Sequence, residues 1–264
     1  MKKIDFKGKW VVVTGASSGL GEALAIELAS KEKANLIITA RRKERLINLK
    51  NKIEKEFGSE VLVISSDLSD PLSVENLFNE SIKQKDVFAI INNAGMTDFN
   101  TADIKHYQKY EQIIEVNFKS LMKLSLLFLE YFKKKNKGAI LNITSMGAFF
   151  PLVYQGVYTA SKHAAQVFTE ILSKENNNSN ITISSFAPGG IATEMLSNSG
   201  LDKLRGSDNF FNWSAKKVAE KAVSSFKKRK LLSVPGFVYK TGLILKRILP
   251  KKTLMYFLEK SYRK

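Results

Sequence analysis

Residues 10–21 read WVVVTGASSGLG, in which a β-branched run leads directly into Gly15, Gly19 and Gly21. The apolar run predicts a buried strand, and residues 22–30 after it have helix-forming composition. Glycines let a backbone turn tightly and approach a ligand closely, while the positive end of a following helix favours an anion. The stretch therefore predicts a strand, a phosphate cradle and a helix. Any strand-to-helix turn can carry glycines, so that alternative stays open.

The alternation of strand and helix continues along the chain. Apolar runs predict further strands at residues 35–40, 60–65, 87–92, 138–144 and 181–187. Amphipathic segments predict helices at residues 21–31, 43–57, 71–83, 104–135 and 158–174. The strands are too continuously apolar for a sheet with one face in water. We therefore predict an α/β fold with a single Rossmann-like, doubly wound parallel sheet flanked by helices.

The composition limits the class of protein. The chain has 264 residues, of which 44% are hydrophobic, enough for one full core. It contains no cysteine, which excludes disulfides and thiolate metal sites and fits a reducing cytoplasm. Its two histidines, His106 and His163, are far apart in the sequence, so no metal site is expected. No apolar signal core and no apolar run of about 18 residues is present, so neither a secretion signal nor a membrane span is expected.

Positive charge is concentrated near the C-terminus. The whole chain has a formal net charge of +17. Residues 216–264 carry 15 Lys or Arg and two Glu, a net charge of +13, which leaves +4 for the first 215 residues. A basic end of this kind can attract an anionic lipid surface, a nucleic acid or an acidic carrier protein, and it is also typical of a solvated surface.

The end of the second predicted strand indicates which cofactor is preferred. It reads TARR over residues 39–42, without the carboxylate that usually grips free ribose hydroxyls. A guanidinium can fork onto phosphate oxygens, so Arg41, with Arg42 second, favours NADP(H) over NAD(H). Two arginines can also simply begin a solvated helix. Asp67, which ends the third strand, can accept a hydrogen bond from an adenine amine or start the next turn.

Tyr158 and Lys162 are four residues apart in a predicted helix and share a face, and Ser145 follows the preceding apolar strand. A nearby ammonium favours phenolate over phenol, so Lys162 is expected to lower the pKa of Tyr158 from about 10. Tyr158 can then give a proton to a carbonyl oxygen and take it back in the oxidative direction, while Ser145 stabilises that oxygen. The alternative is a helix tyrosine with its hydroxyl in solvent.

Six motifs stand in order over roughly residues 8–195. They are TGASSGLG at 14–21, NNAG at 92–95, Asn117, Ser145, YxxxK from Tyr158 to Lys162, and Pro188-Gly189 followed by Thr193. In this order they resemble the classical short-chain dehydrogenase/reductase family. The resemblance implies an NAD(P)-dependent oxidoreductase whose catalytic set is Asn117, Ser145, Tyr158 and Lys162. It also implies that Lys162 holds the nicotinamide ribose and that Asn117 anchors a water that relays protons to Lys162.

The resemblance extends to the cofactor site. It implies that NNAG packs beside the adenosine and that the loop after Pro188 touches the nicotinamide carboxamide and the phosphates. Gly190 departs from the family pattern at the third loop position and opens space there. The expected cofactor-binding residues are Gly15, Ser17, Ser18, Gly19, Leu20, Gly21, Arg41, Arg42, Asp67, Leu68, Asn93, Ala94, Gly95, Tyr158, Lys162, Pro188, Gly189, Ile191 and Thr193.

Apolar residues flank the expected catalytic strand and helix, and a lid is expected at about residues 190–214, where family members commonly carry one. The expected pocket lining is Met96, Met146, Phe149, Phe150, Tyr154, Met195, Phe210 and Phe211. Such a lining predicts an elongated lipophilic carbonyl substrate, a ketone, ketoacyl chain or aldehyde. The alternative is that most of these side chains belong to the core.

The predicted catalytic domain covers residues 1–232, and residues 233–264 form a basic amphipathic helical extension. One face of its first helix is expected to carry Phe237, Val238, Leu245, Ile248 and Leu249; the opposite face is expected to carry Lys240, Arg247 and Lys251. Pro250 ends that helix. The extension can lie on a membrane as an interfacial anchor, pack on the body of the protein or cross a subunit interface, and packing is the preferred interpretation.

These features together predict an NADPH-preferring oxidoreductase that reduces a lipophilic carbonyl to an alcohol. The alternative is a non-catalytic NADP(H)-binding regulator or scaffold, which would not need an acid, its activator and a proton relay. Nucleic acid is not an expected partner, because the basic residues are not interleaved with stacking aromatics. Long apolar helices around residues 121–132 and 164–172 predict a homo-oligomer, a dimer or tetramer. The expected location is the cytoplasm, with peripheral membrane contact through the extension as one option.

Overall fold

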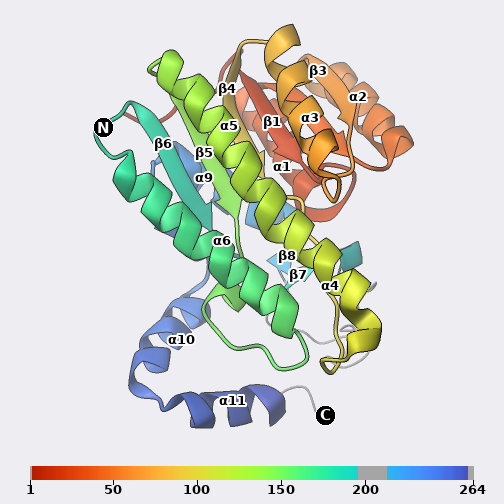
Figure 1. The fold of residues 1–264 in the computed structure, drawn as a ribbon. Coiled ribbons are helices and arrows are strands. Elements are labelled where there is room, and N and C mark those ends of the chain that lie inside the picture. The colour runs from red at the N-terminus through yellow and green to blue at the C-terminus, as the bar shows by residue number, and fades with distance from the viewer. Residues whose placement is uncertain (1, 196–212, 261–264) are drawn as a thin grey trace.

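The computed structural model describes residues 2–195 and 213–260. At its centre is a seven-stranded sheet in the order β3-β2-β1-β4-β5-β6-β9, in which every pair of neighbours is parallel (Figure 1). The strands are β1 (Trp10–Thr14), β2 (Asn35–Ala40), β3 (Val61–Ser65), β4 (Val87–Asn92), β5 (Gly138–Ile143), β6 (Ile181–Phe186) and β9 (Leu232–Ser233). The doubly wound parallel fold predicted from the sequence is confirmed.

Helices cover both faces of this sheet. One face packs against α1 (Gly19–Glu32), α2 (Lys43–Phe57) and α9 (Ala215–Lys227). The other packs against α3 (Pro71–Gln84), α5 (Ser120–Lys134) and α6 (Gly156–Glu175). In Figure 1, α5 and α6 cross in front of the sheet and α9 lies behind it. The sequence analysis did not predict α9, whose buried face packs on α1.

The helix predicted over residues 104–135 is present from Ile104 to Lys134, but its hydrogen-bonding pattern changes along its length. A 3₁₀ turn, η1 (Ile104–His106), leads into α4 (Tyr107–Ile114), and a π-helical turn, η2 (Glu115–Lys119), separates α4 from α5. Hydrophobic periodicity does not detect one extra residue in a turn. Asn117 lies at the middle of this π turn and is fully buried. Such turns are frequent at functional sites because they redirect one side chain out of the helical pattern.

The two ends of the predicted lid meet in a small sheet. β7 (Ile191–Ala192) pairs in parallel with β8 (Trp213–Ser214), and Ile191 stands opposite Trp213. Residues 196–212 between them lie outside the described part of the chain. The two ends of the predicted lid, residues 191–192 and 213–214, therefore lie side by side.

The C-terminal extension forms α10 (Phe237–Ile248) and α11 (Lys251–Lys260), separated at Pro250 as predicted. Both helices lie at the bottom of the view in Figure 1. α10 packs on the body through Tyr239 and Leu243, whereas Phe237 of the predicted apolar face is 79% exposed. The preferred interpretation was that the extension packs on the body of the protein. It does so, but through a face of α10 other than the predicted apolar face. Among the described residues, no helix combines the length and apolarity needed to cross a bilayer.

Candidate active site

The phosphate cradle forms where β1 ends. Gly15 has a φ of 68°, and a Cβ on Gly21 would lie 2.1 Å from the carbonyl oxygen of Gly15, so the turn can close only around glycines. Thr14 joins this turn to the end of β4, because its Oγ1 accepts hydrogen bonds from the backbone N–H groups of Asn93 at 2.9 Å and Ala94 at 3.0 Å. The tight backbone and the first turn of α1 fit a pyrophosphate.

Arg42 lies beside the hydroxyl groups of the cradle. Its guanidinium donates hydrogen bonds to Oγ of Ser17 at 3.1 Å and to Oγ of Ser18 at 2.7 Å. It also pairs with one carboxylate oxygen of Glu194 at 2.9 Å, and Arg45 pairs with the other at 2.6 Å. The hydrogen bonds from Arg45 and Arg42 hold the pKa of Glu194 below its usual value. Arg42 thus already binds an anionic group next to the cradle, as a 2′-phosphate would require.

Three other predicted cofactor residues stand in different surroundings. Arg41 is exposed, and its carbonyl oxygen lies 3.4 Å from Oγ of Ser65. Asp67 forms a turn in which Oδ1 accepts hydrogen bonds from both N–H and Oγ of Ser69, at 3.0 and 2.8 Å. The Leu68 side chain is buried in the core. Asp67 therefore forms the turn that was the alternative to adenine binding. The side chain of Leu68 packs in the core.

Ser145 and Tyr158 border the same small space. Ser145 stands two residues after the end of β5, and its Oγ accepts a hydrogen bond from the N–H of Gly147 at 3.0 Å, which fixes the hydroxyl. A Cβ on Gly147 would lie 3.3 Å from this Oγ and 3.2 Å from Cε1 of Tyr158. Tyr158 stands in the first turn of α6 and is half-buried. The two predicted catalytic hydroxyl residues are thus neighbours.

Lys162 and Asn117 meet on the other side of this space. Lys162 is only 4% exposed, its Nζ donates a hydrogen bond to the carbonyl oxygen of Ile143 at 3.1 Å, and burial lowers its pKa to about 8. Asn117 accepts a hydrogen bond from the N–H of Met96 at 2.7 Å and donates one to the carbonyl oxygen of Met96 at 2.9 Å. A Cβ on Gly95 would lie 3.4 Å from Oδ1 of Asn117 and 3.6 Å from Nζ of Lys162. The two groups predicted to relay protons are therefore close together.

The loop after β6 runs from the catalytic hydroxyls to the cradle. The carbonyl oxygen of Pro188 accepts a hydrogen bond from the N–H of Met146 at 2.8 Å, next to Ser145. At its far end, Thr193 approaches Gly19, where a Cβ would lie 3.0 Å from Cγ2 of Thr193. The predicted cofactor residues Pro188, Gly189, Ile191 and Thr193 therefore line one continuous path between the two halves of the site.

A buried network of polar side chains joins the strands and helices that carry the candidate site. Nδ2 of Asn92 donates hydrogen bonds to Oδ1 of Asn142 at 2.8 Å and to Oγ of Ser125 at 3.1 Å, and Nδ2 of Asn142 donates one to Oγ1 of Thr169 at 2.9 Å. These residues belong to β4, β5, α5 and α6. Because unpaired polar groups in a core are costly, the network fixes the relative placement of the elements that carry the catalytic residues.

The described residues of the predicted substrate lining differ in their burial. Met146 is buried, with the half-buried Phe149 and Phe150 packed against it, while Met195 is 39% exposed. The Tyr154 ring packs edge-on against Phe99 with centroids 5.3 Å apart. Met96 is half-buried beside Asn117, and Phe210 and Phe211 lie outside the described residues. The sequence analysis missed two members of the Met146 cluster, Tyr239 and Leu243, although their spacing of four along an amphipathic helix was a signal.

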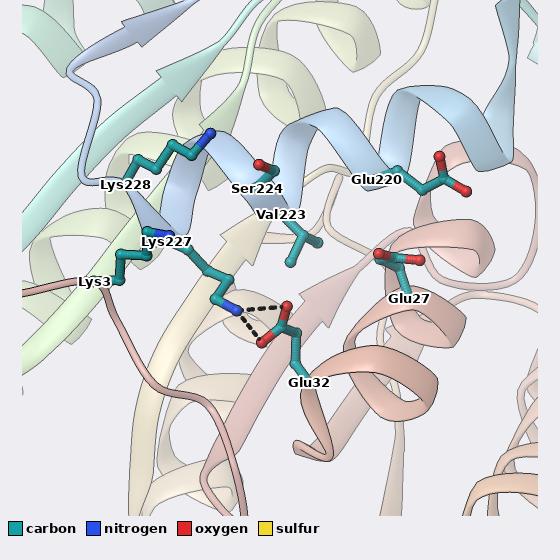
Figure 2. A pocket seen from close by; sticks show the side chains of 8 residues that line it. All are labelled: Lys3, Glu27, Glu32, Glu220, Val223, Ser224, Lys227 and Lys228. Carbon is teal, nitrogen blue, oxygen red and sulfur yellow. Dashed lines mark hydrogen bonds and ion pairs between the residues drawn. The ribbon is translucent and has the colours of Figure 1, made fainter.

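A shallow pocket elsewhere carries none of this chemistry. Figure 2 shows it between α1 and α9, where Lys227 pairs with Glu32 at 2.7 Å. Burial, followed by the nearby charge of Glu220, raises the pKa of Glu27 there. Glu32 is the last residue of α1, about 20 Å along the helix from the cradle at its first residue. None of the predicted site residues lines this pocket.

Comparison with known proteins agrees with this geometry. Residues 9–204 match the family model for short chain dehydrogenase. The chain is 33% identical over 202 residues to the NADP-dependent 3-hydroxy acid dehydrogenase of Schizosaccharomyces pombe. The alignment covers 74% of this chain and 75% of that protein. It is 32% identical over 195 residues to the 17-beta-hydroxysteroid dehydrogenase type 3 of Danio rerio, covering 71% of this chain but only 62% of that relative.

Solved structures show the same architecture. A short-chain dehydrogenase from Sphingobium yanoikuyae in complex with NADPH superposes with a TM-score of 0.81 at 25% identity, covering 91% of this chain and 94% of that one. A short-chain dehydrogenase/reductase from Burkholderia phymatum in complex with NAD gives a TM-score of 0.82 at 20% identity, covering 93% and 95%, and so shows the fold alone. With the family match over most of its length, the chain belongs to the short-chain dehydrogenase family of nicotinamide-dependent oxidoreductases.

Proposed function

We propose that the chain is an NADPH-preferring reductase that converts a lipophilic ketone, ketoacyl group or aldehyde to an alcohol. The observation that carries the proposal is the convergence of Ser145, Tyr158, Lys162 and Asn117 at the end of β5, beside a cradle that fits a dinucleotide. When bound, the nicotinamide cofactor supplies a hydride in reduction and accepts one in oxidation. No observation favours the non-catalytic alternative.

The residues have separate roles in this proposal. Tyr158 donates its phenolic proton to the carbonyl oxygen. Ser145 accepts a hydrogen bond from Gly147, which leaves its own O–H to stabilise the same oxygen as negative charge develops. Lys162 has a pKa of about 8, so it carries its charge at neutral pH and favours the phenolate of Tyr158 after proton transfer. Lys162 then passes a proton to the phenolate of Tyr158, and Asn117 orients the path by which Lys162 regains one.

Replacing the proposed acid separates binding from chemistry. In Tyr158→Phe, kcat should fall about 100-fold or more, the range for a lost general acid, while the Kd for NADPH changes little. Turnover of medium-chain and ring ketones is followed by loss of nicotinamide absorbance, with acetone as the small polar comparison and Tyr107→Phe, an exposed residue of α4, as the control. Unchanged kcat in Tyr158→Phe would remove Tyr158 from the mechanism, and faster turnover of acetone would remove the lipophilic pocket.

The burial of Lys162 predicts a pH dependence of stability. Its folded-state pKa is about 8, against about 10.4 for a lysine in an unfolded chain. Between these values the unfolded chain binds a proton that the folded chain does not, so the free energy of unfolding rises with pH. Relative to Lys162→Met, the wild type should gain about 2 kcal/mol between pH 8 and pH 10 in urea unfolding. Lys52→Met, exposed on α2, should keep the wild-type slope, and a parallel slope for Lys162→Met would contradict the buried ammonium.

The preference for NADPH is proposed to rest on the two arginines after β2. The sequence analysis placed Arg41 first, and the contacts of Arg42 with Ser17 and Ser18 support giving Arg42 the larger share. The likeness to an NADP-dependent enzyme and to an NADPH complex supports the same preference.

Alanine substitutions rank these arginines. Arg42→Ala should raise the Kd for NADPH about tenfold or more, because charge-assisted hydrogen bonds to the 2′-phosphate are lost, and should leave the Kd for NADH within about twofold. Arg41→Ala should show the same selectivity with a smaller loss, and Lys52→Ala should show none. Titration of protein fluorescence with each cofactor measures both constants. Equal losses for NADPH and NADH would show that the arginines do not read the phosphate.

The extension, residues 233–264, is proposed to attach a cytoplasmic catalytic domain, residues 1–232, to an anionic lipid surface. The cysteine-free composition supports that location. Exposed apolar side chains on α10, on α11 and between them include Phe237, Val238, Ile244, Leu245, Leu249, Met255, Tyr256 and Phe257. The same two helices carry six Lys or Arg and one Glu. Apolar residues beside positive charge are complementary to an anionic bilayer, from which a lipophilic substrate could enter directly.

Vesicle flotation tests this attachment. The full chain should float with vesicles that contain phosphatidylglycerol, should float less in high salt, and should stay unbound with phosphatidylcholine alone. Lys251→Glu/Lys252→Glu should weaken flotation, whereas Lys133→Glu/Lys134→Glu on α5 should not. Equal flotation by both double variants, or none by the wild type at low salt, would remove the membrane as the partner.

A second copy of the chain is proposed to cover the outer faces of α4, α5 and α6. Ile114, Leu126, Val167 and Ile171 on these neighbouring helices are between 39% and 53% exposed, and a second copy would remove these apolar side chains from water. Light scattering should give two or four times the chain mass of 29.7 kDa. A mass of one chain at micromolar concentration would contradict self-association.

A further inference from the structure

The inner face of α10 packs on the walls of the candidate active site. Tyr239 and Leu243 join the apolar cluster of Met146, which follows Ser145, and Ala187, which precedes Pro188. A Cβ on Gly242, on the same stripe of α10, would lie 3.4 Å from Cζ of Phe150. A helix that follows the family-matched region therefore contributes to the two loops that carry the chemistry.

Tyr239 makes the closest of these approaches. Its Oη accepts a hydrogen bond from the backbone N–H of Gly190 at 3.2 Å. A Cβ on Gly189 would lie 1.9 Å from Cζ and 2.2 Å from Oη of Tyr239, so the ring occupies the space that any larger residue at position 189 would need. The glycine at position 189 and the backbone N–H of residue 190 are thus matched to one tyrosine of the extension.

Both backbone polar groups of Gly190 make hydrogen bonds, the N–H to Tyr239 and the carbonyl oxygen to Trp213. The carbonyl oxygen of Gly190 accepts a hydrogen bond from the N–H of Trp213 at 3.2 Å, and the ring of Trp213 lies with that of Tyr239 beside Gly236. Immediately after Gly190 the chain enters β7 and reaches Thr193, which contacts the cradle at Gly19. The position of Gly190 therefore determines how the loop reaches the cofactor site.

We propose that Tyr239 is a positioning residue that holds the loop from Gly189 to Ile191 against the cofactor site, so that the extension is part of the cofactor-binding machinery. The proposal rests on the proposed function, because the loop matters only if a dinucleotide binds along it. It explains why position 189 is glycine, because that position must leave room for the Tyr239 ring, and it gives the N–H of Gly190 a partner in the phenol.

A double-mutant cycle between positions 189 and 239 tests the proposal in the full chain. Gly189→Ala should raise the Kd for NADPH about tenfold or more, because the added methyl group displaces the loop from the Tyr239 ring. In a Tyr239→Ala background, the same Gly189→Ala change should cost less than about twofold, because the colliding ring is gone. Tyr256→Ala, an exposed tyrosine of α11, is the matched background and should leave the penalty of Gly189→Ala intact.

A conservative variant separates positioning from general stability. Tyr239→Phe keeps the ring and removes the hydrogen bond, so it should raise the Kd and KM for NADPH about two- to tenfold, the range expected for one net hydrogen bond. Its kcat at saturating cofactor should stay at the wild-type value, and its thermal unfolding midpoint should fall by no more than about 2–4 °C, the loss expected for one hydrogen bond. A lower unfolding midpoint with unchanged Kd would make the contact merely structural and overturn the proposal.

The outcomes distinguish the two proposals. If the wild type binds neither NADPH nor NADH, the proposed function fails. If the wild type binds NADPH and Gly189→Ala costs the same in the wild-type and Tyr239→Ala backgrounds, the proposed function stands and the role of Tyr239 is refuted.

Discussion

Parallel pairing of β1, β4, β5 and β6 brings four strand ends to one edge of the sheet, and each half of the candidate site is attached there. Thr14 at the end of β1 binds the backbone of Asn93 and Ala94 after β4, and the segment after β5 binds the carbonyl oxygen of Pro188 after β6. A register slip of one residue would turn these side chains to the opposite face of the sheet. The cradle and the hydroxyls of Ser145 and Tyr158 are therefore held by the same set of paired strands, and family members can vary the segments around it.

The same part of the structure contains two residues whose placement is unfavourable for folding. Lys162 is buried and loses part of its affinity for a proton, and Asn117 lies in a π turn that interrupts the helical hydrogen-bond pattern. Backbone carbonyl and amide groups satisfy both side chains, and the polar network around Asn142 holds the helices that carry them. Placing a cation beside a phenol and a serine is chemically useful at this edge because the surrounding contacts hold all three in place.

The sequence was sufficient for the six long strands, the cradle and the grouping of the four residues proposed for catalysis, because apolar runs, glycines and short motifs report local constraints that parallel topology then brings together. It was insufficient where the decisive contact is between distant segments. Nothing in residues 39–42 indicates that Arg42, and not Arg41, turns toward Ser17 and Ser18. The short strand β9 has no periodicity to detect, and the packed stripe of α10 depends on the shape of the loops that it meets. The spacing of Tyr239 and Leu243 marks a stripe of a helix, but the partner of Tyr239 could be identified only once Gly189 was seen beneath its ring.

The most direct test is a crystal structure of the full chain with NADP⁺ and an aliphatic secondary alcohol. The account predicts that the alcohol oxygen lies within hydrogen-bond distance of both the Tyr158 hydroxyl and the Ser145 hydroxyl, with the pyrophosphate on the cradle of residues 15–21 and the 2′-phosphate at Arg42. An alcohol bound away from these two hydroxyls, or a dinucleotide bound outside the cradle, would contradict it.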